Sequence, residues 1–219
     1  SNGTLANNNR GVQIQNSRVE TGNANIGISG AASAGAAVTF GNTGVQIMGS
    51  LVQSTGDNTK VLEITGTGGA SATQYSNLGV NILSSTVSTD SAALTITGLA
   101  GKGTVAGANK ANSAGVNLSN YNYDFNGNPT TVGKTVATVV RSTGAAGAGA
   151  VNVYGVALNT SAGDFNDGVR IIGARVESDG ANILVDGQAG SGANSNRGVT
   201  LQRAFNVDGG GTNVDAWIT

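Results

Sequence analysis

The sequence predicts an all-β fold: a right-handed parallel β-helix, or β-solenoid, of about six coils with three strands in each coil. Three observations lead to this prediction. A Gly-Val dipeptide recurs along the chain, apolar and polar residues alternate after each copy, and the repeats are too rich in Gly and β-branched residues to hold a helix each. Repeats of roughly 30 to 36 residues with only strand signals fit coils whose strands pair with their equivalents one coil away.

The first strand of each coil begins at the dipeptide. The residue after Val is polar and the next is Ile or Leu, which is the alternation of a strand with one buried face. The dipeptides are Gly11-Val12, Gly44-Val45, Gly79-Val80, Gly115-Val116, Gly168-Val169 and Gly198-Val199. The polar positions include Gln13, Gln46, Asn81 and Asn117. We expect this column to face outward, where uncharged side chains avoid like-charge stacking.

Two further strands complete each coil. The second begins at a small residue, at Ser17, Ser50, Ser85, Ala174 and Ala204, and carries Val two places later at Val19, Val52, Val87 and Val176. The third has two alternating apolar residues followed by Gly, at Ile26/Ile28/Gly30, Leu62/Ile64/Gly66, Leu94/Ile96/Gly98, Val151/Val153/Gly155 and Ile183/Val185/Gly187. Gly155-Val156 therefore starts no further coil. The segments between coils are rich in Gly, Ser, Ala, Asn and Thr and read as turns.

The fourth coil departs from this pattern. The spacing from Gly115 to Gly168 is longer than between any other consecutive dipeptides, and Tyr121 and Tyr123 take the positions of the small residue and Val. We expect residues 119–135, which include Pro129, to form a projecting loop or an extra strand pair. At the other irregular place, residues 215–219 read as a third strand that is still in progress.

Both ends of the predicted solenoid carry open strand edges, because no amphipathic or charge-rich segment covers them. Either residues 1–219 are one solenoid domain within a longer solenoid, or they form a subunit that stacks end to end through Val12, Ile14, Trp217 and Ile218. The predicted partners are accordingly flanking coils of the same chain or identical subunits. Six coils about 4.8 Å apart would make a rod section of about 29 Å.

Composition excludes several functions. The net charge is -1 and no basic run occurs, so neither nucleic acid nor an anionic membrane is an expected partner. Cys and His are both absent, which removes zinc sites, thiolate chemistry and imidazole acid–base catalysis, and we expect no cofactor. No signal peptide opens the chain and no apolar run approaches about 18 residues, so we expect a soluble, processed or excised segment.

The phrase Gly79-Val-Asn-Ile-Leu-Ser-Ser-Thr-Val-Ser-Thr, followed by Leu94-Thr-Ile-Thr-Gly, resembles repeats of filamentous-haemagglutinin-like bacterial surface adhesins. The resemblance extends over nearly the whole chain, from Arg10 to Ile218. It implies a right-handed β-helix that is secreted and displayed at the cell surface, as an adhesin or a stalk. The N-terminal secretion domain of such proteins is not recognisable in this sequence.

Catalysis on a β-helix needs carboxylates that converge on one face, often with a basic residue or calcium. Asp124 and Glu177 fall at equivalent outward positions of adjacent coils near Arg175, which we interpret as a solvated face with one like-charge pair. Asp164 and Asp167 lie in a turn where a weak calcium loop is possible, although Asp also caps turns without metal. We therefore predict no catalytic residue and no metal site.

The aromatic cluster Tyr121, Tyr123 and Phe125 either fills a widened core or contacts a ligand or partner. The first functional prediction is an extracellular cell-surface adhesin or fibre component that provides length, rigidity and display without catalysis. The alternative is a carbohydrate-binding or polysaccharide-degrading β-helix that uses the loop from Tyr121 to Pro129, with surface polysaccharide as its partner.

Overall fold

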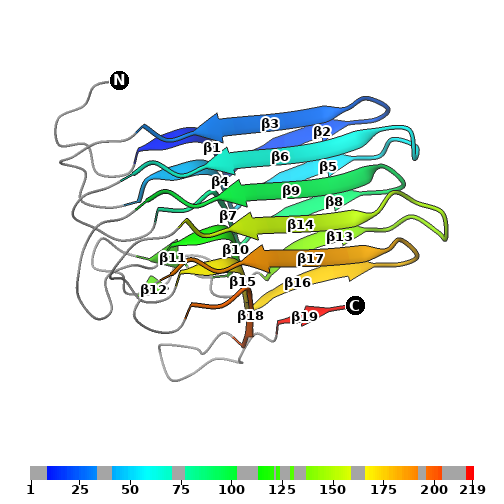
Figure 1. Cartoon of the computed structure of the whole chain (residues 1–219). Helices are drawn as coiled ribbons and strands as arrows, with labels where there is room; N and C mark the ends of the chain where they lie inside the picture. Colours follow the sequence, from blue (N-terminus) through cyan, green and yellow to red (C-terminus); the bar gives the residue numbers. More distant parts are fainter. Residues whose placement is uncertain are drawn as a thin grey trace.

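The computed structural model describes residues 9–33, 41–70, 77–102, 113–120, 122–123, 129–130, 137–158, 166–191, 196–203 and 216–219. Every regular element in these ranges is a strand, and three parallel sheets run along a right-handed β-helix (Figure 1). The first and last coils lie at opposite ends of the stack. No helix in this part of the chain is long and apolar enough to cross a membrane.

Each sheet collects one strand from every coil. The first sheet contains β1 (Arg10–Gln15), β4 (Thr43–Met48), β7 (Val80–Leu83), β10 (Ala114–Ser119), β15 (Asp167–Ile172) and β18 (Val199–Gln202). The second contains β2 (Arg18–Thr21), β5 (Leu51–Ser54), β8 (Thr86–Thr89), β13 (Thr138–Ser142), β16 (Ala174–Ser178) and β19 (Trp217–Ile218). The third contains β3 (Ile26–Ala31), β6 (Val61–Thr67), β9 (Ala93–Leu99), β14 (Val151–Val156) and β17 (Ile183–Gln188). The predicted coil of three strands is confirmed.

Neighbouring coils pair in the register that the repeats predict. In the first sheet Val12 lies opposite Val45, so the Val of one dipeptide stacks on the Val of the next. In the third sheet Gly155 pairs with Gly98 on one side and Gly187 on the other. Gly155 therefore closes a third strand, as expected, and starts no coil.

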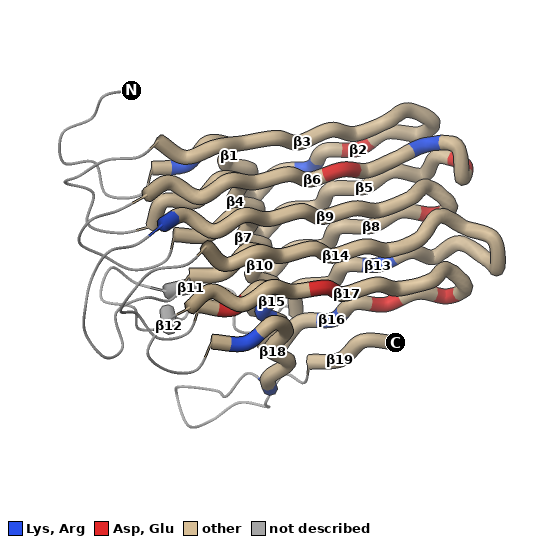
Figure 2. The backbone as a smooth tube through the Cα atoms, viewed as in Figure 1, with Lys and Arg blue, Asp and Glu red and all other residues tan. Residues whose placement is uncertain are grey.

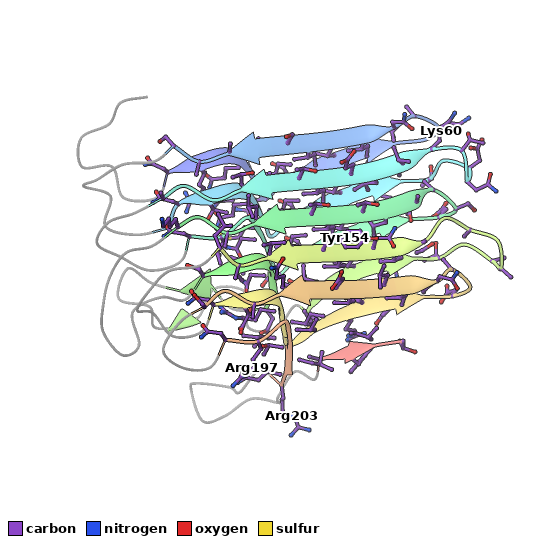
Figure 3. All side chains as sticks on the ribbon, viewed as in Figure 1. Lys60, Tyr154, Arg197 and Arg203 are labelled. Atoms are coloured by element: carbon purple, nitrogen blue, oxygen red, sulfur yellow. The ribbon has the colours of Figure 1, made fainter. Side chains whose placement is uncertain are left out.

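Inward side chains form one continuous core between the three sheets (Figure 3). Strand alternation sends every second side chain inside, which places Val, Ile and Leu in columns along the stack. The largest fully buried side chains are Val45, Ile47, Val52, Leu62, Ile64, Val80, Ile82, Leu94, Ile96, Leu118 and Ile171. Each contributes roughly 1.5–3 kcal/mol when it is buried. Stacking of like on like is therefore a principal source of the stability of the rod.

Glycines mark a line where the backbones of the first and third sheets touch. A Cβ at Gly98 would overlap the carbonyl oxygen of Gly115, and a Cβ at Gly115 would overlap the backbone of Gly155 and Val156. The same relation joins Gly30 to Gly44, Gly66 to Gly79, Gly155 to Gly168, and Gly187 to Gly198. The recurring Gly of the dipeptide is thus required by close backbone packing.

The corner between the first and second strands turns through a residue in the left-handed conformation. Asn16, Gly49, Ser84 and Gly173 have φ values of 48°, 57°, 46° and 55°. The inter-coil ladder continues through the corner, since the N–H of Gly49 donates to the carbonyl oxygen of Leu83 at 3.0 Å. Asn, Gly and Ser hold this position because they tolerate positive φ better than β-branched residues do.

The long insertion of the fourth coil is confirmed, but its alignment differs from the prediction. The second strand of this coil is β13, where Val140 pairs with Val87 and Val176 and so takes the Val position. The alignment of Tyr121 and Tyr123 with that strand was therefore wrong. Instead, β11 (Asn122–Tyr123) pairs antiparallel with β12 (Pro129–Thr130) in a separate two-stranded sheet, which is the expected extra strand pair.

The last strand also differs from the prediction. Trp217 pairs with Arg175 and Ile218 with Val176, so β19 is the second strand of the sixth coil and not a third strand. Ala216, directly before β19, packs against the core, whereas Ala204, predicted as the small residue here, lies outside the described residues. The chain therefore has a longer connection at the same corner in the fourth and sixth coils.

Candidate functional site

The outward column of the first sheet is covered. Gln46, Asn81, Asn117, Arg170 and Thr200 are all buried, although strand alternation turns them away from the core. Nδ2 of Asn117 donates to Oδ1 of Asn81 at 2.8 Å, so the amides form a ladder between coils. The predicted register of this column is confirmed, while its predicted exposure is wrong beyond the first coil.

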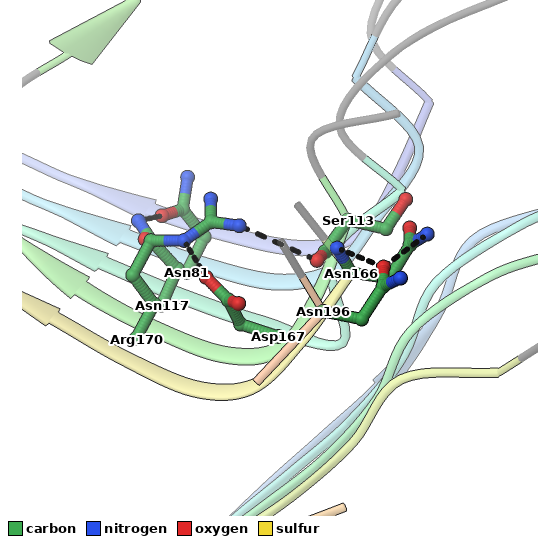
Figure 4. Close-up of polar contacts among 7 residues, drawn as sticks. All are labelled: Asn81, Ser113, Asn117, Asn166, Asp167, Arg170 and Asn196. Carbon is green, nitrogen blue, oxygen red and sulfur yellow. Dashed lines mark hydrogen bonds and ion pairs between the residues drawn. The ribbon is translucent and has the colours of Figure 1, made fainter. Parts of the chain in front are cut away.

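In the fifth coil this covered face carries a charged pair, Arg170 and Asp167 (Figure 4). Nε of Arg170 donates to Oδ2 of Asp167 at 2.8 Å, and both side chains are buried. A terminal nitrogen of Arg170 also donates to the carbonyl oxygen of Ser113 at 3.5 Å. Asp167, considered above for a calcium loop, therefore has a carboxylate oxygen engaged by a guanidinium. Its predicted companion Asp164 lies outside the described residues.

A second polar column was missed by the sequence analysis. Nδ2 of Asn42 donates to Oδ1 of Asn77 at 3.2 Å, and Nδ2 of Asn166 donates to Oδ1 of Asn196 at 3.1 Å. The repeat carries a signal for this column, because Asn stands two places before the Gly of the dipeptide in most coils. These residues are Asn9, Asn42, Asn77, Asn166 and Asn196. Amide ladders of this kind bond adjacent parallel strands side chain to side chain.

The small residues at the first corner do more than fit the space. Oγ of Ser85 accepts the N–H of Ser50 at 3.1 Å and donates to the carbonyl oxygen of Leu83 at 2.7 Å. In the fourth coil Oγ1 of Thr138 donates to the carbonyl oxygen of Ser119 at 2.6 Å. Thr138 thus makes the same bond across the insertion that Ser85 makes within a tight corner.

The C-terminal end of the stack exposes its core columns. Val199, Leu201 and Ile218 are 41%, 51% and 41% exposed, whereas their equivalents Val169, Ile171 and Val176 in the fifth coil are fully buried. At the N-terminal end Val12, Ile14 and Val19 are only partly buried. Within the described residues the third sheet has five strands and ends at β17, whereas the other two sheets have six strands each. Both ends are therefore apolar and have unpaired strand edges.

Trp217 does not belong to the core, although it was predicted as a stacking residue together with Ile218. It stands outward on the second sheet, where the guanidinium of Arg175 lies 4.5 Å from the centre of its ring. Its Nε1 donates to Oε1 of Glu177 at 3.3 Å, and Arg175 lies 3.5 Å from the same carboxylate. One face of the indole is thus held by an arginine that is itself paired.

The first coil repeats this arrangement without the tryptophan. Arg18 binds Glu20 through two nitrogens at 2.7 and 2.9 Å, in an Arg-Val-Glu sequence that matches residues 175–177. The hydrogen bond from Arg18, with its positive charge in addition, lowers the pKa of Glu20. The pair is exposed at the N-terminal end of the second sheet.

The predicted like-charge pair on the second sheet was wrong. Arg141 of the fourth coil lies opposite Glu177, and Asp124 is outside the described residues. Figure 2 shows that acidic and basic residues are sparse on the described coils. No group of three or more His, Cys, Asp or Glu that could hold a metal ion occurs in the described part of the chain.

Of the predicted aromatic cluster, Tyr121 and Phe125 lie outside the described residues, and Tyr123 is placed on β11. Tyr154, which was not predicted as a contact residue, stands outward on β14 between Thr97 and Asp186 (Figure 3). Comparisons of the chain with protein-family models, with curated proteins and with solved structures find no match.

Proposed function

We propose that this chain is a non-catalytic structural section of a secreted, surface-displayed adhesive protein of the filamentous-haemagglutinin-like type. The observation that carries the proposal is the continuity of the core columns from the first coil to the last, with apolar side chains partly or largely exposed at both ends. A stack of this kind needs no catalytic group, and the number of its coils sets the length and rigidity of the rod. Its apolar ends suit continuation of the stack, either by flanking coils or by a second copy of the chain.

The polar ladders support the same proposal. Buried amides of Asn81, Asn117 and Asn42 bond coil to coil, outside the apolar core, and so resist sliding of one coil on the next. In the buried pair of Arg170 and Asp167, Oδ2 of the carboxylate accepts from the guanidinium at 2.8 Å. These groups are committed to holding the rod together, which favours a mechanical role.

Surface labelling of the source cells tests the location. An antibody raised against this chain should bind intact cells, and brief protease treatment of the cells should remove the signal. Beads coated with the purified chain should adhere to surfaces that the source cells colonise, and beads coated with albumin should not. Signal only after cell lysis, or release of reducing ends from polysaccharides by the purified chain, would contradict the proposal.

A second candidate function, carbohydrate binding or cleavage, is favoured by the extra strand pair. β11 and β12 form a sheet apart from the three main sheets, and β11 carries Tyr123. Aromatic rings on such an extension stack well on sugar rings. Binding to a polysaccharide panel that disappears in a Tyr121→Ala/Tyr123→Ala double variant would establish it, and unchanged or absent binding would remove it.

A further inference from the structure

We infer that the C-terminal end of this solenoid binds the N-terminal end of a second copy, with Trp217 held between Arg175 of its own chain and Arg18 of the second copy. The inference rests on the proposed structural function and names the partner of the open ends. It follows from the side-chain columns, which assign each described strand residue of the last coil a neighbour in the next coil of the stack.

The apolar columns match across such a junction. If the first coil of a second copy continues the first and second sheets, Val199 meets Val12, Leu201 meets Ile14, and Ile218 meets Val19. Each pair joins residues of one inward column, so like stacks on like, as within the chain. The most exposed apolar side chains of the last coil then become buried.

The polar columns match as well. Asn196 meets Asn9 and continues the amide ladder, and Gln202 meets Gln15. Stacked amides bond parallel strands only when the strands are in register, so these columns favour one register over a slipped one. The junction is therefore specified on both faces of the first sheet.

Trp217 gives the junction its specificity. Arg18, Arg175 and Trp217 belong to one outward column of the second sheet, which runs through Leu51, Thr86 and Val139. Arg175 already covers one face of the indole at 4.5 Å. In a head-to-tail stack Arg18 of the second copy faces the other side of the ring. Because Glu20 holds its guanidinium, Arg18 is positioned to stack as Arg175 does.

Two features oppose the contact and limit its strength. Within the described residues the third sheet has one strand fewer than the other two, so no described strand of the sixth coil pairs with β17 at the junction. In addition, exposed Arg197 would meet Arg10 of the second copy, which places two positive charges in neighbouring coils. We therefore expect reversible association, and we expect Arg197→Gln to strengthen it.

Sedimentation velocity over a concentration series tests the inference. The wild-type chain should associate, and Trp217→Ala or Arg18→Gln should weaken association about 10-fold or more. Lys60→Gln is the matched control, because it also removes one positive charge, but from the turn before β6 in the second coil, away from Trp217, Arg175, Glu177 and Arg18. It should leave association unchanged. Electron microscopy at high concentration should show rods with an axial repeat near about 29 Å.

A mixing experiment separates a head-to-tail contact from a symmetric one. Trp217→Ala damages only the C-terminal end and Arg18→Gln only the N-terminal end, so an equimolar mixture should form heterodimers with one intact junction. Failure of the mixture to associate better than either variant would overturn the head-to-tail arrangement. A wild-type chain that stays monomeric at all concentrations would overturn the inference while leaving the proposed structural function intact, because flanking coils could still continue the rod.

Discussion

Among single residues, the recurring glycines matter because they have no Cβ and so allow neighbouring backbones to come into contact. Gly98 of the third sheet and Gly115 of the first sheet let two backbones approach so closely that neither position has room for a Cβ. Gly27 lies in the same third sheet but meets nothing within 4 Å of where its Cβ would be. These positions therefore respond differently to the same substitution.

We predict that Gly98→Ala destabilises the chain by roughly 3 kcal/mol, because the added methyl group must displace the backbone of the next coil. The matched variant Gly27→Ala should change the free energy of unfolding by less than about 1 kcal/mol and in the stabilising direction, since Ala restricts the unfolded chain. Urea unfolding of both variants measures the difference. Equal effects would show that the backbones of the first and third sheets can move apart to accommodate a methyl group at Gly98.

Asp57 is a pH-sensitive residue in the turn between β5 and β6. Its Oδ1 accepts the hydroxyl of Thr59, and the N–H of Thr59 at 2.9 Å, and these bonds lower its pKa. A lowered pKa in the folded state means that Asp57 stabilises the fold above its unfolded pKa of about 3.9 and loses this effect as pH falls through the folded value.

We therefore predict that Asp57→Ala lowers the melting temperature at pH 7 but has a smaller effect as the pH falls through the lowered pKa of Asp57, where the wild-type carboxylate takes up a proton. Thermal melting of both chains across this range measures the change. Asp57→Asn is the control, because its amide oxygen can still accept from Thr59 and does not titrate. A difference between wild type and Asp57→Ala that stays constant with pH would contradict the prediction.

At the scale of the strands, serine hydroxyls connect the corner of one coil to the next. Ser85 satisfies a backbone N–H of the preceding coil, that of Ser50, and donates to a carbonyl of its own coil. Ser88, three residues along the chain, is also buried, but its Oγ has no hydrogen-bond partner among the described residues. Of these two buried serines in one coil, Ser85 therefore makes hydrogen bonds that stabilise the fold and Ser88 does not.

We expect Ser85→Ala to cost about 1–3 kcal/mol, because it leaves the buried N–H of Ser50 without an acceptor. Ser88→Ala should be neutral or stabilising, because it removes a buried hydroxyl that makes no bond. Chemical denaturation of the two single variants provides the comparison. A destabilising Ser88→Ala, with a harmless Ser85→Ala, would show that the hydroxyl ladder is not a source of stability.

At the scale of the whole molecule, burial varies along the rod because each coil contacts only its neighbours. Leu118 in the fourth coil is fully buried, while Leu201, its equivalent in the sixth coil, is 51% exposed. In repeat architectures of this kind stability is close to a sum over coils and their interfaces. The middle of the stack should therefore unfold last.

We predict that Leu118→Ala costs about 2–5 kcal/mol, and Leu201→Ala less than about 1 kcal/mol at dilutions where the chain is monomeric. Hydrogen exchange should show the strongest amide protection in β7, β10 and β15, with β18 and β19 exchanging fastest. If Leu201→Ala is as costly as Leu118→Ala, or if β18 is as protected as β10, the last coil is covered and the end-to-end inference loses its basis.

The sequence predicted the coil because its signals are local and repeated. Each Gly-Val dipeptide, with Ile or Leu two places after its Val, fixes one strand and its inward face, and the repeat length fixes which strands pair. The same reasoning failed where a coil has an insertion. Tyr121 and Tyr123 were aligned with a strand that Thr138 to Ser142 form, because nothing local distinguishes an inserted residue from a strand residue.

Periodicity and the pairing of like with like were enough to predict the parallel β-helix and its core columns. Three features became visible only in the folded chain: the close approach of backbones at the recurring glycines, the burial of Gln46, Asn81 and Asn117, and the stacking of Trp217 on Arg175. The difference arises because alternation along a strand predicts only which way a side chain points. What lies over that side chain depends on distant segments and on the neighbouring coil.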